Sequence, residues 1–188
     1  MTVFEYVTAA LLLILGIGVT QLLTDVVDAF RRRQTTPLDW IPMTWAALVF
    51  AAQMQFVWAV YELNGLRSAW TAVEFTGVLL LALLLFVAGA LVVPRASDEA
   101  TDAWTQFLQD GRWALLVLIA FFVAAYVVNI GLFDESPLSV ANLENLVLAA
   151  LLAVILRSRS RRAWRWLTLL FVVLYAISIG LLSPASYG

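Results

Sequence analysis

Long apolar stretches separated by short polar segments make up most of this chain. A bilayer core of about 30 Å is crossed by about 20 helical residues that rise about 1.5 Å each. Six stretches have this length: residues 6–27, 41–62, 69–93, 113–133, 137–156 and 164–182. The first lacks a positively charged start and a small-residue cleavage motif, so we expect a retained helix and not a signal peptide. The pattern predicts an all-α polytopic membrane protein, with six transmembrane helices in a single domain over residues 1–188.

The arginines lie almost entirely on alternate loops, and this predicts an orientation in the membrane. The loops after the first, third and fifth helices are residues 28–40, 94–112 and 157–163, and they carry or adjoin ten of the eleven arginines. Only Arg67 lies on a loop of the opposite side. Basic residues accumulate in cytoplasmic loops. We therefore expect these three loops in the cytoplasm and both chain ends outside.

The loop between the third and fourth helices has an amphipathic pattern of its own, over residues 97–111. Ser97 suits the N-cap of a helix and Gly111 suits its end. One apolar stripe recurs at helical spacing, and it consists of Ala100, Trp104, Phe107 and Leu108. The pattern predicts a short helix at the cytoplasmic interface. An alternative interpretation is a docking surface for a cytoplasmic protein, carried by Trp104, Phe107 and Leu108.

One carboxylate is hard to place outside the bilayer. The fifth span is limited by Asp134 and Glu135 on one side and by an arginine run on the other, so Glu144 falls about 10 Å inside it. A charged carboxylate at this depth costs a few kcal/mol unless it is paired, protonated or facing water. Its face of the helix is partly polar and consists of Ala141, Glu144, Asn145, Leu148 and Leu152, flanked by Asn142. We take Glu144, with Asn142 and Asn145, as the main candidate for a pore or substrate site.

Other spans contribute polar side chains that, together with Glu144, could line a polar cavity open to the outer side of the membrane. They are Gln53 and Gln55 in the second span, Asn129 in the fourth and Glu74 at the start of the third. Glu74 can also lie at the interface, because the residues after it are enough to span the bilayer. The alternative for the amides is hydrogen bonding between helices that only fixes their packing, typically worth about 0.6 kcal/mol each in membranes.

Composition excludes several chemistries. The chain is 63% apolar and 13% charged and contains no cysteine or histidine, and all 11 of its basic residues are arginine. Thiol and imidazole chemistry and lysine Schiff bases are therefore excluded. We expect no catalytic residues, no enzyme activity, no cofactor and no metal site. With a net charge of −2 and no basic face, we expect no nucleic-acid partner.

Two functions remain open from the sequence. One is an oligomeric, cation-preferring pore or a proton or solute carrier built around Glu144, for which we expect a homo-oligomer in the lipid bilayer. The other is a non-catalytic membrane scaffold or subunit that recruits a cytoplasmic protein. In general outline the chain resembles six-span bacterial membrane proteins. This resemblance implies nothing about activity. We expect a multi-pass protein that is integral to the cytoplasmic (inner) membrane.

Overall fold

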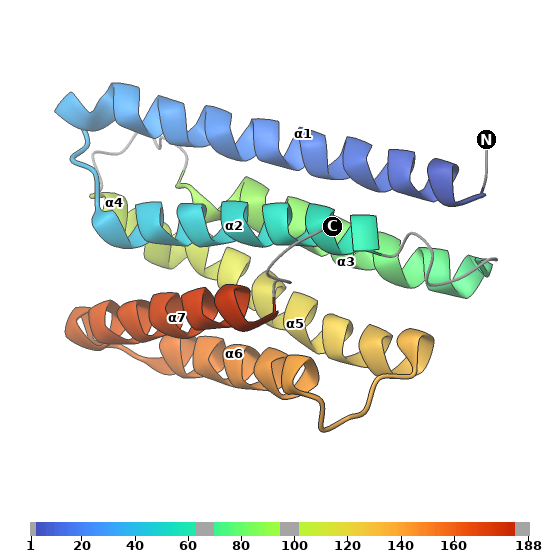
Figure 1. The fold of residues 1–188 in the computed structure, drawn as a ribbon. Coiled ribbons are helices and arrows are strands. Elements are labelled where there is room, and N and C mark those ends of the chain that lie inside the picture. Colours follow the sequence, from blue (N-terminus) through green and yellow to red (C-terminus); the bar gives the residue numbers. More distant parts are fainter. Residues whose placement is uncertain (1–2, 63–69, 95–101, 183–188) are drawn as a thin grey trace. The chain divides into compact units, whose positions relative to one another are not determined.

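The computed structural model is all-helical and describes residues 3–62, 70–94 and 102–182 (Figure 1). Six of the described helices are long and apolar enough to cross a membrane, which is consistent with a multi-pass membrane protein. They are α1 (Val3–Arg31), α2 (Trp40–Glu62), α3 (Ala72–Val92), α5 (Arg112–Phe133), α6 (Val140–Arg157) and α7 (Arg161–Leu182). Two short segments lie between α3 and α5, namely α4 (Ala103–Gln106) and the single π-helical turn η2 (Phe107–Gly111). A 3₁₀ turn, η1 (Arg32–Gln34), follows α1.

The ends of the helices follow local capping groups more than hydropathy. The α3 helix begins at Ala72 because Thr71 is its N-cap, three residues after the start of the predicted span. The α6 helix begins at Val140, and not at Pro137, because Ser139 accepts a hydrogen bond from the backbone N–H of Asn142. Hydropathy does not register such caps, since they depend on single hydroxyl groups.

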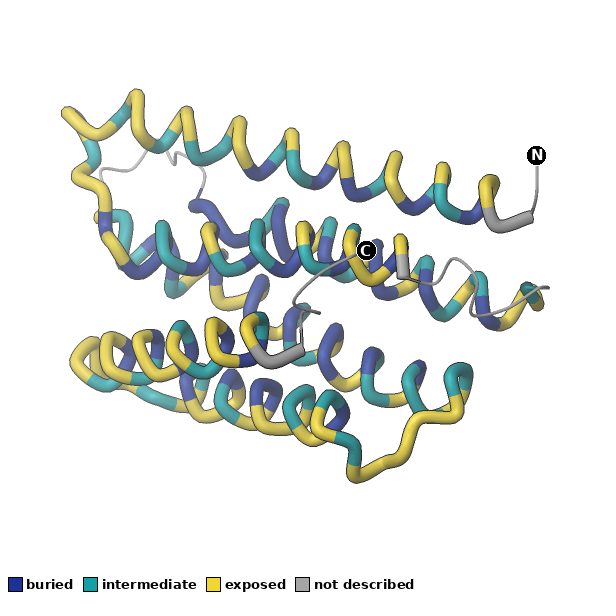
Figure 2. Tube along the Cα trace, in the orientation of Figure 1, coloured by how far each residue is buried: buried dark blue, intermediate teal, exposed yellow. Residues whose placement is uncertain are grey.

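The chain divides into two compact units, Met1–Leu118 and Ile119–Gly188, and α5 continues from the first into the second. In the first unit α1 packs along α2 and α3, which also pack against each other. Buried positions recur along one side of each of these helices (Figure 2). The single domain and the orientation inferred from the sequence stay predictions.

A separate interfacial helix before α5 is not confirmed. The described helix begins after Asp102, whose side chain accepts a hydrogen bond of 2.8 Å from the N–H of Thr105. It does not end at Gly111 but runs through η2 into α5. Gly111 does not act as a helix end. It lies in a π turn where the Phe107 ring packs so close to its backbone that a side chain larger than hydrogen would clash. The predicted cap, Ser97, lies outside the described residues.

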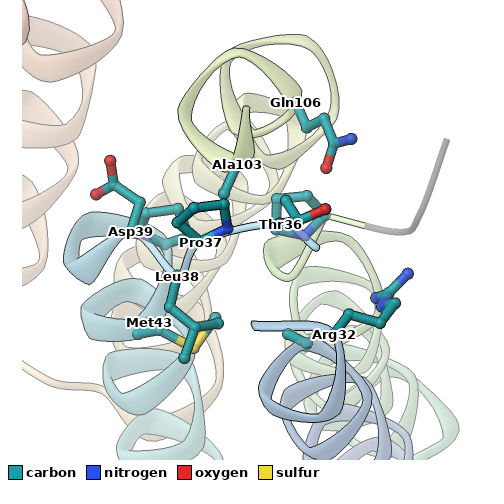
Figure 3. Close-up of a pocket in the computed structure, with 11 residues that line it drawn as sticks. Arg32, Thr36, Pro37, Leu38, Asp39, Met43, Ala103 and Gln106 are labelled. Carbon is teal, nitrogen blue, oxygen red and sulfur yellow. The ribbon is translucent and has the colours of Figure 1, made fainter. Parts of the chain in front are cut away.

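Two of the predicted cytoplasmic loops meet at one end of the first unit. A small depression there is lined by Arg32, by the turn over residues 36–39, and by Pro94 and Gln106 from the segments that follow α3 (Figure 3). The side chain of buried Asp39 accepts a hydrogen bond from the backbone N–H of Ile41, with 2.9 Å between Oδ1 and N. This bond holds the start of α2 in place. Residues of the loops after the first and third spans thus lie together in the first unit.

In the second unit α6 and α7 form a hairpin. The buried face of α7 recurs at intervals of four and three residues and consists of Trp164, Thr168, Phe171, Tyr175 and Ser178. Facing positions on α6 follow the same spacing through Leu148, Leu152 and Ile155. Such spacing is typical of helix pairs that pack knobs into holes. The ring of Phe171 also lies 6.4 Å from that of Phe122 on α5, which joins all three helices of the unit.

Candidate functional site

The carboxylate of Glu144 lies on α6, one of the helices long and apolar enough to cross a membrane, and it is held by a neighbouring helix. Glu144 is partly exposed and lies about 6 Å from the start of α6, four residues after Val140. The hydroxyl of Ser178 on α7 donates a hydrogen bond to its Oε1 atom. The 18 residues of α6 extend only about 27 Å, against about 30 Å for the bilayer core. An α6 helix that crosses the bilayer has no turn to spare, so a position of Glu144 within the membrane stays a prediction.

No positive charge compensates this carboxylate within the described part of the chain. Ser178 is its one hydrogen-bond partner there, and no described arginine lies within ion-pair distance. Arg157 is on the same helix, but it is 13 residues further along, about 20 Å away. The site therefore presents a carboxylate and a hydroxyl, which are oxygen groups suited to a proton or a small cation.

Two polar side chains on the buried face of α7, Ser178 and Tyr175, lie one turn apart. Ser178 is 5% exposed, and Tyr175, one turn before it on the same face, is also buried. Asn145, next to Glu144, is partly exposed and forms no hydrogen bond with any described residue. Ser178 and Tyr175 were not among the candidates from the sequence. The spacing of buried residues on α7 could have indicated their face, but not their partner.

The predicted pair Asn129 and Asn142 forms a clamp across the turn between α5 and α6. Asn142 is fully buried and accepts a hydrogen bond of 3.0 Å from Nδ2 of Asn129. Its own Nδ2 donates to the backbone oxygen of Ser136 at 2.8 Å. Both polar atoms of the Asn142 side chain are thus occupied in closing the turn, which favours packing over the lining of a pore.

Asn142→Ala is expected to destabilise the protein by about 1–2 kcal/mol, because it leaves the Asn129 amide and the Ser136 carbonyl without their partner. The measurement is unfolding by sodium dodecyl sulfate in mixed micelles. Asn145→Ala is the matched control, since Asn145 makes no described hydrogen bond, and it should change stability by less than about 0.5 kcal/mol. Equal losses in the two variants would contradict the clamp.

The predicted glutamines belong to the first unit, and Gln53 is its central polar group. Gln53 is fully buried, and its Nε2 donates to the backbone oxygen of Leu85 on α3 at 3.2 Å. Its Oε1 atom has no hydrogen-bond partner among the described residues. Glycines make room for the amide: a Cβ on Gly89 would lie 2.8 Å from Nε2 and one on Gly18 would lie 3.1 Å from it. Gln55 is only partly buried.

Gly89→Ala is expected to destabilise the first unit by about 1–3 kcal/mol, because the added methyl group must displace the buried Gln53 amide. Unfolding in mixed micelles measures the loss. Gly16→Ala is the control, because a Cβ on Gly16 meets nothing within 4 Å. Adding Gln53→Ala to the Gly89 variant should recover part of the lost stability, and strictly additive effects would rule out this contact.

Glu74 lies at the start of α3, where its role is capping. Its Oε2 accepts hydrogen bonds from the backbone N–H of Thr71 at 2.7 Å and from the Thr71 hydroxyl at 2.9 Å. The N–H of Glu74 donates back to that hydroxyl oxygen, which completes a capping box. This geometry favours the interfacial alternative over a pore-lining role for Glu74.

The residues predicted to dock a partner differ in exposure. Phe107 is fully buried, while Trp104 and Leu108 are partly exposed. The rings of Trp104 and Phe107 lie 6.2 Å apart. Phe107 is therefore a core residue, and only the other two are accessible for contact with another protein.

Comparison of the chain with protein-family models, with curated proteins and with solved structures finds no match. Any functional assignment therefore comes from the site itself.

Proposed function

We propose that this protein carries protons or small cations across the membrane, with Glu144 as the exchanging group. The observation behind the proposal is the carboxylate of α6, whose described partner is the Ser178 hydroxyl and not an arginine. An uncompensated charge in the bilayer costs a few kcal/mol or more. A proton or cation that binds Glu144 neutralises the charge and removes this cost. Glu144 can therefore take up and release the transported ion.

Ser178 fits this role as a positioning residue. A hydroxyl has one donor and two acceptor lone pairs. It donates to the ionised carboxylate, and when Glu144 is protonated it can accept instead. The pair thus remains hydrogen-bonded in both charge states, which keeps the two forms of the site close in structure.

Acidic residues at the end of the second unit that we predict to face outward support a preference for cations. In the second unit Asp134 and Glu135 are exposed on the turn between α5 and α6, at the same end of α6 as Glu144. Negative charge near an entrance raises the local concentration of cations and lowers that of anions. Six spans form only a small helix bundle. The proposal therefore includes a homo-oligomer in which the complete ion path runs between copies of the chain.

The experiment is flux through the purified protein in liposomes. Vesicles with and without protein are given a gradient of protons, Na⁺ or K⁺, and the decay is followed with a pH- or ion-sensitive dye. The protein should accelerate the decay of at least one cation gradient and leave a chloride gradient unchanged. Decay equal to that in empty vesicles for all three cations would sink the proposal.

The alternative is a membrane scaffold that binds a cytoplasmic protein through the start of α4. It is favoured by the partial exposure of Trp104 and Leu108, although Phe107 is not available for docking. An inactive but folded protein in the flux experiment would favour this second function.

A further inference from the structure

The turn between α6 and α7 carries the strongest positive patch of the second unit. Five arginines fall within nine residues, and all of them are exposed. They are Arg157, Arg159, Arg161, Arg162 and Arg165. No acidic residue follows Glu144 in the chain. The acids of this unit, Asp134, Glu135 and Glu144, lie beyond the opposite end of α6 or in its first turns, away from the arginines of the turn.

The arginines after α1 are in a different situation. Arg31 pairs with Asp28 at 3.6 Å, and Nε of Arg32 donates to the Asp28 backbone oxygen at 3.2 Å. The guanidinium of Arg33 lies 4.1 Å above the ring of Phe30 and donates to its carbonyl. These three side chains are engaged by their own helix.

On the α6–α7 turn, by contrast, four arginines make no hydrogen bond or ion pair with any described residue. They are Arg157, Arg159, Arg162 and Arg165. Membrane orientation requires only the charges, which both clusters have. What distinguishes the second cluster is that its guanidinium donors are available to an acceptor outside the chain.

The backbone of the turn is held in place beneath these side chains. Ser158 caps the end of α6, and its carbonyl accepts a hydrogen bond of 3.0 Å from Nε1 of buried Trp164. Trp166, two residues further on, is 65% exposed. A tryptophan at the end of a span typically lies at the depth of the lipid head groups. The start of α7 also carries the partial positive charge of its helix dipole. The first turn has no acidic residue to offset this charge, so it adds to that of the arginines.

We propose that the α6–α7 turn binds the phosphate groups of anionic phospholipids. Guanidinium groups bind phosphate through paired N–H donors, which suits the free arginines. A lipid is the occupant that fits, because the patch lies where two spans end, beside an interfacial tryptophan. The proposal does not depend on the transport function of Glu144.

The experiment compares two variants that lose equal charge. R159Q/R162Q/R165Q removes free arginines, and R31Q/R32Q/R33Q removes engaged ones. Purified proteins in neutral detergent are titrated with phosphatidylglycerol or phosphatidylcholine, and bound lipid is counted by native mass spectrometry. We expect the wild type to prefer phosphatidylglycerol. The α6–α7 variant should lose about tenfold or more of that affinity, and the α1 variant less than about threefold.

Equal losses in the two variants would overturn the proposal, because net charge alone would then explain binding. Displacement of the lipid by millimolar inorganic phosphate would also overturn it, since the site would then be one for free anions. Circular dichroism checks the fold of each variant. R159K/R162K/R165K keeps the charge but loses paired donors, so it should bind severalfold more weakly even if the glutamine variant does not fold. Unchanged binding by this lysine variant would contradict recognition by guanidinium groups.

Discussion

Glu144→Gln is expected to reduce the cation flux of the reconstituted protein to that of empty vesicles. The amide has almost the shape of the carboxyl group and still accepts a hydrogen bond from Ser178 through its oxygen. It cannot bind or release a proton, and it has no charge to attract a cation. The site would keep its geometry and lose its exchange chemistry.

Glu135→Gln is the matched control, because it makes the same chemical change on the exposed turn before α6. Its flux should stay within about twofold of the wild type. Ser178→Ala should give an intermediate flux, since the carboxylate remains but loses its orientation. The Glu144 variant should be at least as stable as the wild type in mixed micelles, because a neutral amide is less costly in the bilayer than a charge. Equal flux from the Glu144 and Glu135 variants would refute the role of Glu144.

Gly111→Ala is expected to destabilise the protein by about 3 kcal/mol, the upper part of the usual range for overpacking. A Cβ on Gly111 would lie 2.2 Å and 2.6 Å from two carbons of the Phe107 ring. Phe107 is fully buried, so its ring cannot turn away without disturbing the side chains packed around it. The methyl group therefore forces a shift of the π turn that joins α4 to α5.

Unfolding in mixed micelles again provides the measurement. Gly131→Ala is the control on α5, the helix that follows the π turn, because a Cβ there meets nothing within 4 Å. It should be neutral or stabilising by up to about 1 kcal/mol, as alanine favours helix. Combining Gly111→Ala with Phe107→Leu should cost less than the sum of the two single changes, because the smaller side chain makes room for the methyl group. Similar stabilities for Gly111→Ala and Gly131→Ala would contradict the contact.

The position of Glu144 shows how far hydropathy alone could reach. Its depth follows from counting apolar residues between charged limits, and that count depends only on the chain. The start of α6 at Val140 changes the depth from about 10 Å to about 6 Å without moving Glu144 out of the span. The partner, Ser178, is 34 residues away along the chain, and nothing local to either residue indicates the pairing.

Gln53 and Phe107 show the same limit in the first unit. Helical spacing placed Gln53 in the middle of α2, but its contact with Leu85 requires glycine at positions 18 and 89 on two other helices. The amphipathic stripe that suggested docking through Phe107 was equally consistent with a core residue. Only the π turn and Gly111 decide that its ring points inward.

The sequence by itself determined the six apolar helices and that Glu144 lies on one of them, and from the arginines it predicted an orientation. These follow from the free energy of transferring contiguous residues into a bilayer, which adds up along the chain. The tertiary structure decided which faces meet, and so which polar groups pair. Lipid and protein interior are similarly apolar, and a helix such as α3 is apolar on all sides. Its rotation is therefore set by shape and by single hydrogen bonds to its neighbours, which the order of residues does not reveal.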